Sequence, residues 1–109
     1  MAYDRELADR VRELLAPRGA EEKPMFGGLA FLVNGNMSVV VSGHGGLMVR
    51  VPADDTDTLL ATAHVEPMIM SGRQVRGWVR VGAPALGTRR RLSAWVERGV
   101  GVAAALPAK

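Results

Sequence analysis

Two glycine-containing segments divide the middle of the chain into short apolar runs, and this spacing constrains the fold more than any other feature. Asn34-Gly35-Asn36 separates the run Met25–Val33 from Met37–Ser42, and Gly43–Gly46 ("GHGG") separates that run from Leu47–Val51. Asn and Gly tolerate the positive φ angles that tight hairpin turns require. The spacing therefore predicts three strands joined by hairpins, and such strands pair antiparallel.

Helical patterns flank these strands. Asp4 is a suitable N-cap for a first helix, which Pro17 and Gly19 would end. The apolar residues of this helix recur on one stripe of period 3.6: Leu7, Val11, Leu14 and Leu15. Pro52 and the acidic residues after it predict a second helix, because proline and carboxylates both suit a first helical turn. Its inward-facing residues would be Leu59, Leu60 and Ala63.

The last third of the chain predicts two more strands and a final helix. The strands are Glu66–Met70 and Gly77–Val81, linked by "SGRQVR". The helix begins within "PALGTRRR" and runs toward Leu106, with Trp95 in the core. With "AEEKP" taken as a polar link, the order is α-β-β-β-α-β-β-α. We expect residues 1–109 to form one α+β domain, a two-layer sandwich with an antiparallel five-stranded sheet.

Composition limits the classes of protein. Hydrophobic residues make up 48% of the chain, which is enough for one core, and there is no cysteine for a disulfide or a thiolate site. No apolar run is long enough to span a bilayer, and the N-terminus has no apolar segment of a signal peptide. We expect a cytoplasmic protein that makes no membrane contact.

Charge is distributed unevenly along the chain. Residues 1–66 carry six Lys/Arg and ten Asp/Glu, whereas residues 67–109 carry eight Lys/Arg and only Glu97. A basic half of this kind steers acidic partners or nucleic acid, and a solvated basic helix explains it equally well. The arginines concerned are Arg73, Arg76, Arg80, Arg89, Arg90 and Arg91.

Motifs for catalysis or cofactor binding are weak. Gly27 and Gly28 lead into a strand and "GHGG" lies between strands, whereas phosphate loops lead into a helix. His44 and His64 lack further ligands at zinc-site spacing. We therefore assign no catalytic residue, metal ligand or cofactor, and take the Gly27-Gly28 pair as a bend where the first strand begins. A pocket near Met25–Gly28 and His44, in an enzyme or small-molecule binder, remains an alternative.

Five methionines fall in or beside the predicted strands, where they serve either the core or a surface that accepts varied partners. They are Met25, Met37, Met48, Met68 and Met70.

Four segments in this order and spacing resemble the TfoX N-terminal domain family. They are "MFGGLAFLVNGNM", "LMVRV", "SGRQVRGWVRV" and "LSAWVERGVGVAAALP". The resemblance covers Tyr3 to Pro107 and implies a two-layer domain arranged α-β3-α-β2-α, in agreement with the order predicted from periodicity. The proteins that give the family its name are transcription regulators of competence for DNA uptake. They also carry a helical C-terminal domain, which we expect to be absent from this chain.

The resemblance implies a regulatory role and supplies no catalytic residues. We accordingly expect a non-enzymatic protein-interaction module with an unidentified protein partner. The predicted interaction surface comprises Phe26, Gly27, Gly28, Arg73, Arg76, Trp78 and Arg80, together with Arg89, Arg90 and Arg91. The alternative is a nucleic-acid-binding accessory protein that uses the basic C-terminal half. A homodimer through a sheet edge or the last helix is a further expectation, because small sheets have edges to protect.

Overall fold

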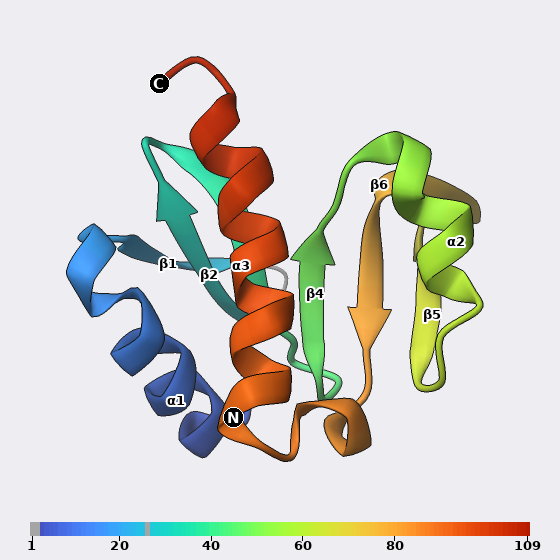
Figure 1. Cartoon of the computed structure of the whole chain (residues 1–109), viewed down its shortest axis with the longest axis horizontal. Coiled ribbons are helices and arrows are strands. Elements are labelled where there is room, and N and C mark those ends of the chain that lie inside the picture. Colours follow the sequence, from blue (N-terminus) through green and yellow to red (C-terminus); the bar gives the residue numbers. More distant parts are fainter. Residues whose placement is uncertain (1–2, 26) are drawn as a thin grey trace.

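The centre of the structure is a sheet of six strands that are all antiparallel (Figure 1). The computed structural model describes residues 3–25 and 27–109. In spatial order β1-β2-β3-β4-β6-β5, the strands are β1 (Glu21–Met25), β2 (Gly28–Val33), β3 (Asn36–Val41), β4 (Leu47–Arg50), β6 (Arg73–Val81) and β5 (Val65–Met70).

The predicted number of five strands is wrong, because the polar link "AEEKP" contributes an additional strand. β1 pairs with β2 in the register Glu21↔Leu32 to Met25↔Gly28 and forms one edge of the sheet. Its first four residues are exposed, so burial imposes no apolar alternation on this strand. Charged side chains and a proline are the residues expected at a strand edge that must not pair further.

Two tight turns adopt the backbone that their residues favour. Asn34 and Gly35 have φ angles of 55° and 79°, which confirms the predicted hairpin between β2 and β3. Ser71 and Gly72, at 52° and 77°, form the whole turn between β5 and β6. Arg73–Arg76 therefore belongs to β6, and the longer link predicted there is wrong.

The predicted first strand, Met25–Val33, is divided at its glycine pair. Met25 ends β1, Gly27 lies in the turn with a φ angle of 72°, and Gly28 begins β2. The glycines thus connect two strands of a hairpin instead of leading from a loop into the first strand. Phe26 lies outside the described residues.

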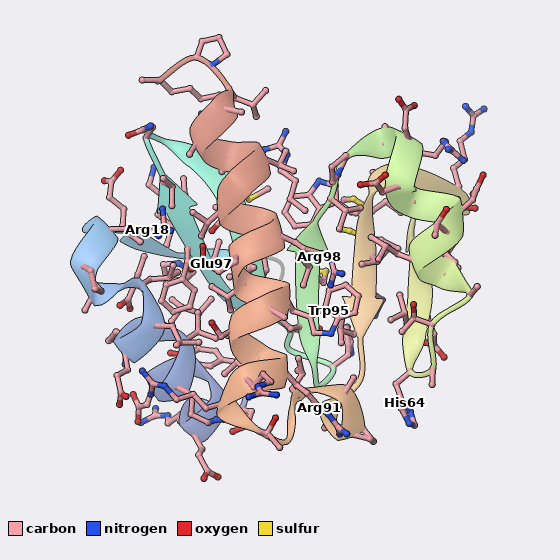
Figure 2. All side chains as sticks on the ribbon, viewed as in Figure 1. Arg18, His64, Arg91, Trp95, Glu97 and Arg98 are labelled. Carbon is pink, nitrogen blue, oxygen red and sulfur yellow. The ribbon has the colours of Figure 1, made fainter. Side chains whose placement is uncertain are left out.

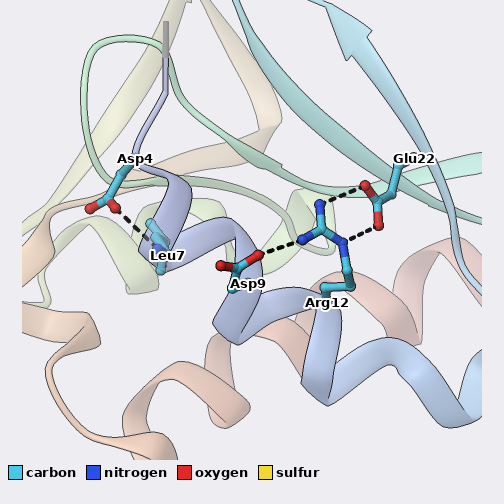
Figure 3. Close-up of polar contacts among 5 residues, drawn as sticks. All are labelled: Asp4, Leu7, Asp9, Arg12 and Glu22. Carbon is cyan, nitrogen blue, oxygen red and sulfur yellow. Dashed lines mark hydrogen bonds and ion pairs between the residues drawn. The ribbon is translucent and has the colours of Figure 1, made fainter. Parts of the chain in front are cut away.

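Three helices have defined bounds. α1 (Arg5–Leu15) begins at Asp4, whose Oδ1 accepts a hydrogen bond from the Leu7 amide at 3.1 Å (Figure 3). α3 (Arg89–Ala105) begins at Thr88, whose hydroxyl accepts one from the Arg91 amide. α2 (Thr56–Leu60) is shorter than predicted, and Ala63, expected to face inward, is exposed because the helix ends before it. Short 3₁₀ turns, at Ala16–Arg18, Ala53–Asp55 and Ala83–Leu86, complete the described elements.

The main core lies between one face of the sheet and helices α1 and α3. α3 crosses in front of the middle of the sheet in Figure 1, and α1 lies beside it. The largest fully buried side chain is Phe31, and Trp95 is 6% exposed, which confirms its predicted core position. Gly99 brings α3 so close to β3 that a Cβ at this position would collide with the carbonyl oxygen of Ser38.

A second, smaller cluster occupies the opposite face of the sheet, which we call the methionine face. Met48 and Met68 are buried there with Ala30, Leu32 and Val40, and half-buried Met25, Met37 and Trp78 pack against them. Met70 is 42% exposed. Among the described residues, no helix is both long and apolar enough to cross a membrane.

Candidate interaction groove

The structure places the residues of the predicted interaction surface on different faces. Val79 and Val81 of β6 point into the core under the helices. Trp78 and Arg80 alternate with them and therefore point toward the methionine face. Arg89, Arg90 and Arg91 begin α3 on the helical face. Arg73, at the start of β6, is exposed and pairs in register with Met70.

Several of these arginines have local partners. Arg76 pairs with Asp57 Oδ1 at 3.1 Å and donates to the carbonyl of Ala53, which attaches β6 to the start of α2. Arg89 pairs with Glu13 of α1 at 2.6 Å. Arg80 donates to the hydroxyl of Ser42 at 3.3 Å. These contacts join neighbouring elements.

Gly28 has a packing role. It is buried, and a Cβ there would collide with the carbonyl oxygen of Val41. Gly27 is exposed and has a φ angle of 72°, a conformation that suits glycine. The glycine pair therefore serves the hairpin and its contact with β3.

A groove runs along α3 on the side away from α1, and we call it the α3 groove. It consists of two hollows of about 510 and 450 Å³ that share Arg98. The residues that α3 contributes follow helical spacing along one stripe. They are Arg91, Ala94, Trp95, Arg98, Gly101, Val102 and Ala105, followed by Leu106 at the helix end, and Glu97 borders the second hollow beside this stripe.

The first hollow is basic. Arg91 and Arg98 of α3 face His64 and Ala63 of the segment between α2 and β5, and Pro84 and Ala85 of the third 3₁₀ turn complete the wall with Thr62. No acidic residue is among the described residues that line it. In Figure 2, Arg91, Trp95 and Arg98 lie on the side of α3 that faces His64.

The second hollow is mainly apolar. Gly101, Val102 and Ala105 of α3, with Leu106 directly after the helix, form one side, and Pro52 and Asp55 form the other. Glu97 also borders this hollow, but its carboxylate pairs with Arg18 at 2.9 Å. In the view of Figure 2, Arg18 and Glu97 lie to the left of the α3 ribbon and Arg98 lies to its right.

Arg98 lies where the two hollows meet. Its guanidinium carbon is 4.6 Å from the centroid of the Trp95 ring, within cation–π range. Within residues 3–25 and 27–109, Arg98 makes no ion pair, and its side chain is exposed. The Trp95 ring thus holds the positive charge of Arg98 at the centre of the groove. The N–H groups of the Arg98 guanidinium remain available to another molecule.

The sequence model of the TfoX N-terminal domain family matches residues 13–103, which is most of the chain. The chain belongs to the TfoX N-terminal domain family. A comparison with curated proteins returned no match. Both glycine turns and most of the α3 stripe, from Arg91 to Val102, lie inside the matched range, so the groove is formed largely by the TfoX N-terminal domain itself.

A cavity lies beside His44, one of the two places named for the predicted pocket. His44 lines a cavity of about 350 Å³ with His64, Glu66 and Arg80, at the end of the sheet where the β3–β4 turn meets β5 and β6. Met25–Gly28 does not line it among the described residues. No group of three or more His, Cys, Asp or Glu in the described chain has the geometry to hold a metal ion.

The residue pattern of the last helix indicates the α3 groove. The predicted interaction surface does not include Arg98 or Gly101, and Val102 and Leu106, farther along the same helix, are half-buried. The late helix has one buried apolar stripe toward the sheet and another stripe on which small residues alternate with Arg91 and Arg98. Two stripes of different composition indicate two packed or binding faces, whereas a single solvated face is typically charged throughout.

Proposed function

We propose that this TfoX N-terminal domain is a non-enzymatic regulatory module that binds a partner protein through the α3 groove. The observation that carries the proposal is the groove itself, which combines apolar walls with two arginines on one helix face. Recognition surfaces between proteins combine an apolar centre with arginine and tryptophan anchors in this way. Family membership supports the regulatory character of the module.

The start of α3 supports a role for its arginines beyond folding. Three arginines occupy the first turn, where the helix dipole disfavours positive charge, and no acidic residue is present there. Arg89 alone among the three forms an ion pair within the described part of the chain. Residues that act against local stability are often those that a binding function requires.

Crosslinking tests the proposal directly. A photoreactive amino acid is placed at Ala94, which is exposed in the groove, or at Ala104, which is exposed on the same helix but lines neither hollow. We expect a specific protein to be captured from native lysate at Ala94 and not at Ala104. The purified partner should then bind the unmodified domain, and it should bind the Gly101→Leu variant more weakly. Capture of background proteins only, or equal capture at both positions, would contradict the proposal.

Nucleic-acid binding remains the alternative. Counterion release predicts an affinity that falls steeply as salt rises, and neutralising Arg89, Arg90 and Arg91 together should abolish it. Fluorescence anisotropy with a labelled DNA and a labelled RNA oligonucleotide measures both effects. Salt-dependent binding that requires these arginines, without any protein capture at Ala94, would replace the present proposal by the alternative.

A further inference from the structure

We infer that the segment received by the α3 groove is an amphipathic helix of the partner, with carboxylates at one end and small or medium apolar side chains at the other. This inference rests on the proposed function and names the chemistry of the partner. It follows from the different charges of the two hollows and from the backbone that surrounds them.

The first hollow requires an acidic occupant. Arg91 and Arg98 contribute two positive charges, and His64 lies opposite them. The guanidinium of Arg98 is held over Trp95 and makes no ion pair with a described residue. Carboxylates bind guanidinium groups in a fixed bidentate geometry, whereas a basic segment would be repelled here.

The second hollow disfavours a carboxylate at the side where Asp55 lies, away from the shared Arg98. Asp55 is its one acidic side chain without an ion pair among the described residues, since Glu97 is neutralised by Arg18. A carboxylate placed beside Asp55 would be repelled, so the acidic residues of the occupant belong opposite Arg91 and Arg98. Val102 and Leu106 are half-buried and present apolar surface to the other end.

A helix fits this groove better than an extended segment. The walls are side chains of α3 and the loops opposite, and neither free edge of the sheet, β1 or β5, contributes a residue of β structure to the hollows. An added strand would leave its backbone groups unpaired, whereas a helix satisfies its own. Ala94, Gly101 and Ala105 are small enough for close approach between helices.

The length of the groove sets the length of the occupant. From Arg91 to Leu106 the helix axis advances about 22 Å at 1.5 Å per residue. A partner helix that follows the whole groove therefore needs about 15 residues, or four turns.

The probes are three labelled synthetic peptides of this length. The first is helical, with glutamates in one half and alanine and leucine along one face of the other. The second replaces the glutamates by lysines, and the third keeps the glutamates but has a central proline, which breaks the helix. We expect only the first to bind. On addition of this peptide to the ¹⁵N-labelled domain, the resonances that shift should include the Trp95 indole and the amides of Arg98 and Gly101.

Matched variants assign the binding to the groove. Arg98→Glu should weaken binding of the first peptide at least about tenfold, and Gly101→Leu should weaken it similarly by filling the second hollow. The controls, Arg90→Glu and Ala104→Leu, introduce the same two residues at exposed positions that line neither hollow. A Cβ at Gly101 meets nothing within 4 Å, so we expect the fold to tolerate the larger side chain.

Each failure has its own meaning. Equal binding of the glutamate and lysine peptides, equal binding of the proline peptide, or equal effects of Arg98→Glu and Arg90→Glu would overturn the inference. So would an absence of binding by the first peptide, or self-association through the groove in light scattering. The proposed function would survive these results if the crosslinked partner still bound at Ala94, and it would fail only if no partner bound there.

Discussion

At the scale of single residues, Gly99 and Gly101 show how position on one helix decides the effect of a methyl group. Gly99 faces β3, where a Cβ would collide with the Ser38 carbonyl oxygen and press on Val39. Gly101 faces the α3 groove, where a Cβ meets nothing within 4 Å. Gly99 is therefore required for the packing of α3 on β3. Gly101 instead leaves open space in the second hollow, because it has no side chain.

Alanine substitution at these two positions should therefore have opposite effects. We expect Gly99→Ala to lower the free energy of unfolding by about 1–3 kcal/mol, because α3 must move away from the sheet. Gly101→Ala should raise it by about 0.5–1 kcal/mol, because alanine loses less backbone entropy in a helix. Urea denaturation of the two variants measures both values, and a loss of stability at Gly101 would contradict the open space assigned to that position.

A second residue-scale prediction concerns the ion pair between α1 and β1. The guanidinium of Arg12 donates to both carboxylate oxygens of Glu22, at 2.5 and 2.8 Å, and also contacts Asp9 (Figure 3). The hydrogen bond from Arg12, with its charge, holds the pKa of Glu22 below the usual value. Stabilisation by this carboxylate is therefore complete above the unfolded pKa of about 4.3 and is lost as the pH falls through the lower, folded value.

Glu22→Gln should destabilise the domain at pH 7 by less than about 1 kcal/mol, because both side chains are partly exposed. The difference between the two proteins should disappear once the pH falls below the folded pKa. Urea midpoints of both proteins across this range test the sign, and a difference that grew on acidification would contradict it.

At the scale of elements, α3 is both the longest helix and the one whose first turn is electrostatically unfavourable. Arg90 is exposed there and makes no ion pair with a described residue. Since the helix N-terminus favours negative charge, Arg90→Glu should stabilise the domain by about 0.3–1 kcal/mol at low ionic strength. Thermal unfolding at low and high salt measures the gain, and added salt should reduce it.

The same elements show what the sequence could predict. The helices α1 and α3, the Asn34-Gly35 turn and the later strands carry strong local signals, and the structure has them within a few residues of the prediction. β1 carried no such signal, because an exposed edge strand is held by backbone hydrogen bonds that any residue except proline donates. The α3 groove depends on how α3 lies against the loop before β5, a tertiary relation that helical periodicity does not specify.

At the scale of the whole molecule, Asn36 connects the hairpin of the sheet to the end of α3. It was predicted only as part of the turn, yet its side chain is 2% exposed. Its Nδ2 donates to the carbonyl oxygens of Ala103 at 3.3 Å and Pro107 at 3.0 Å. The amide of Lys109 donates to the Asn34 carbonyl at 2.9 Å, so the turn holds the last residues from two sides.

Asn36→Ala should cost about 1–3 kcal/mol of unfolding free energy, because the Pro107 carbonyl loses its donor and the Ala103 carbonyl keeps only the Leu106 amide. Hydrogen exchange should rise selectively in the last turn of α3, before global unfolding. Exchange that rose evenly over the whole domain would contradict a local link between the turn and the helix end.

The two tryptophans lie on opposite sides of the sheet. Trp95 packs under Arg98 in the α3 groove, and half-buried Trp78 lies on the methionine face with Arg50 5.7 Å from its ring centroid. The domain thus contains one intrinsic fluorophore for each surface. In variants that keep a single tryptophan, emission from Trp95 should respond to a ligand in the groove and emission from Trp78 to one on the methionine face, so light alone would distinguish the side on which a partner binds.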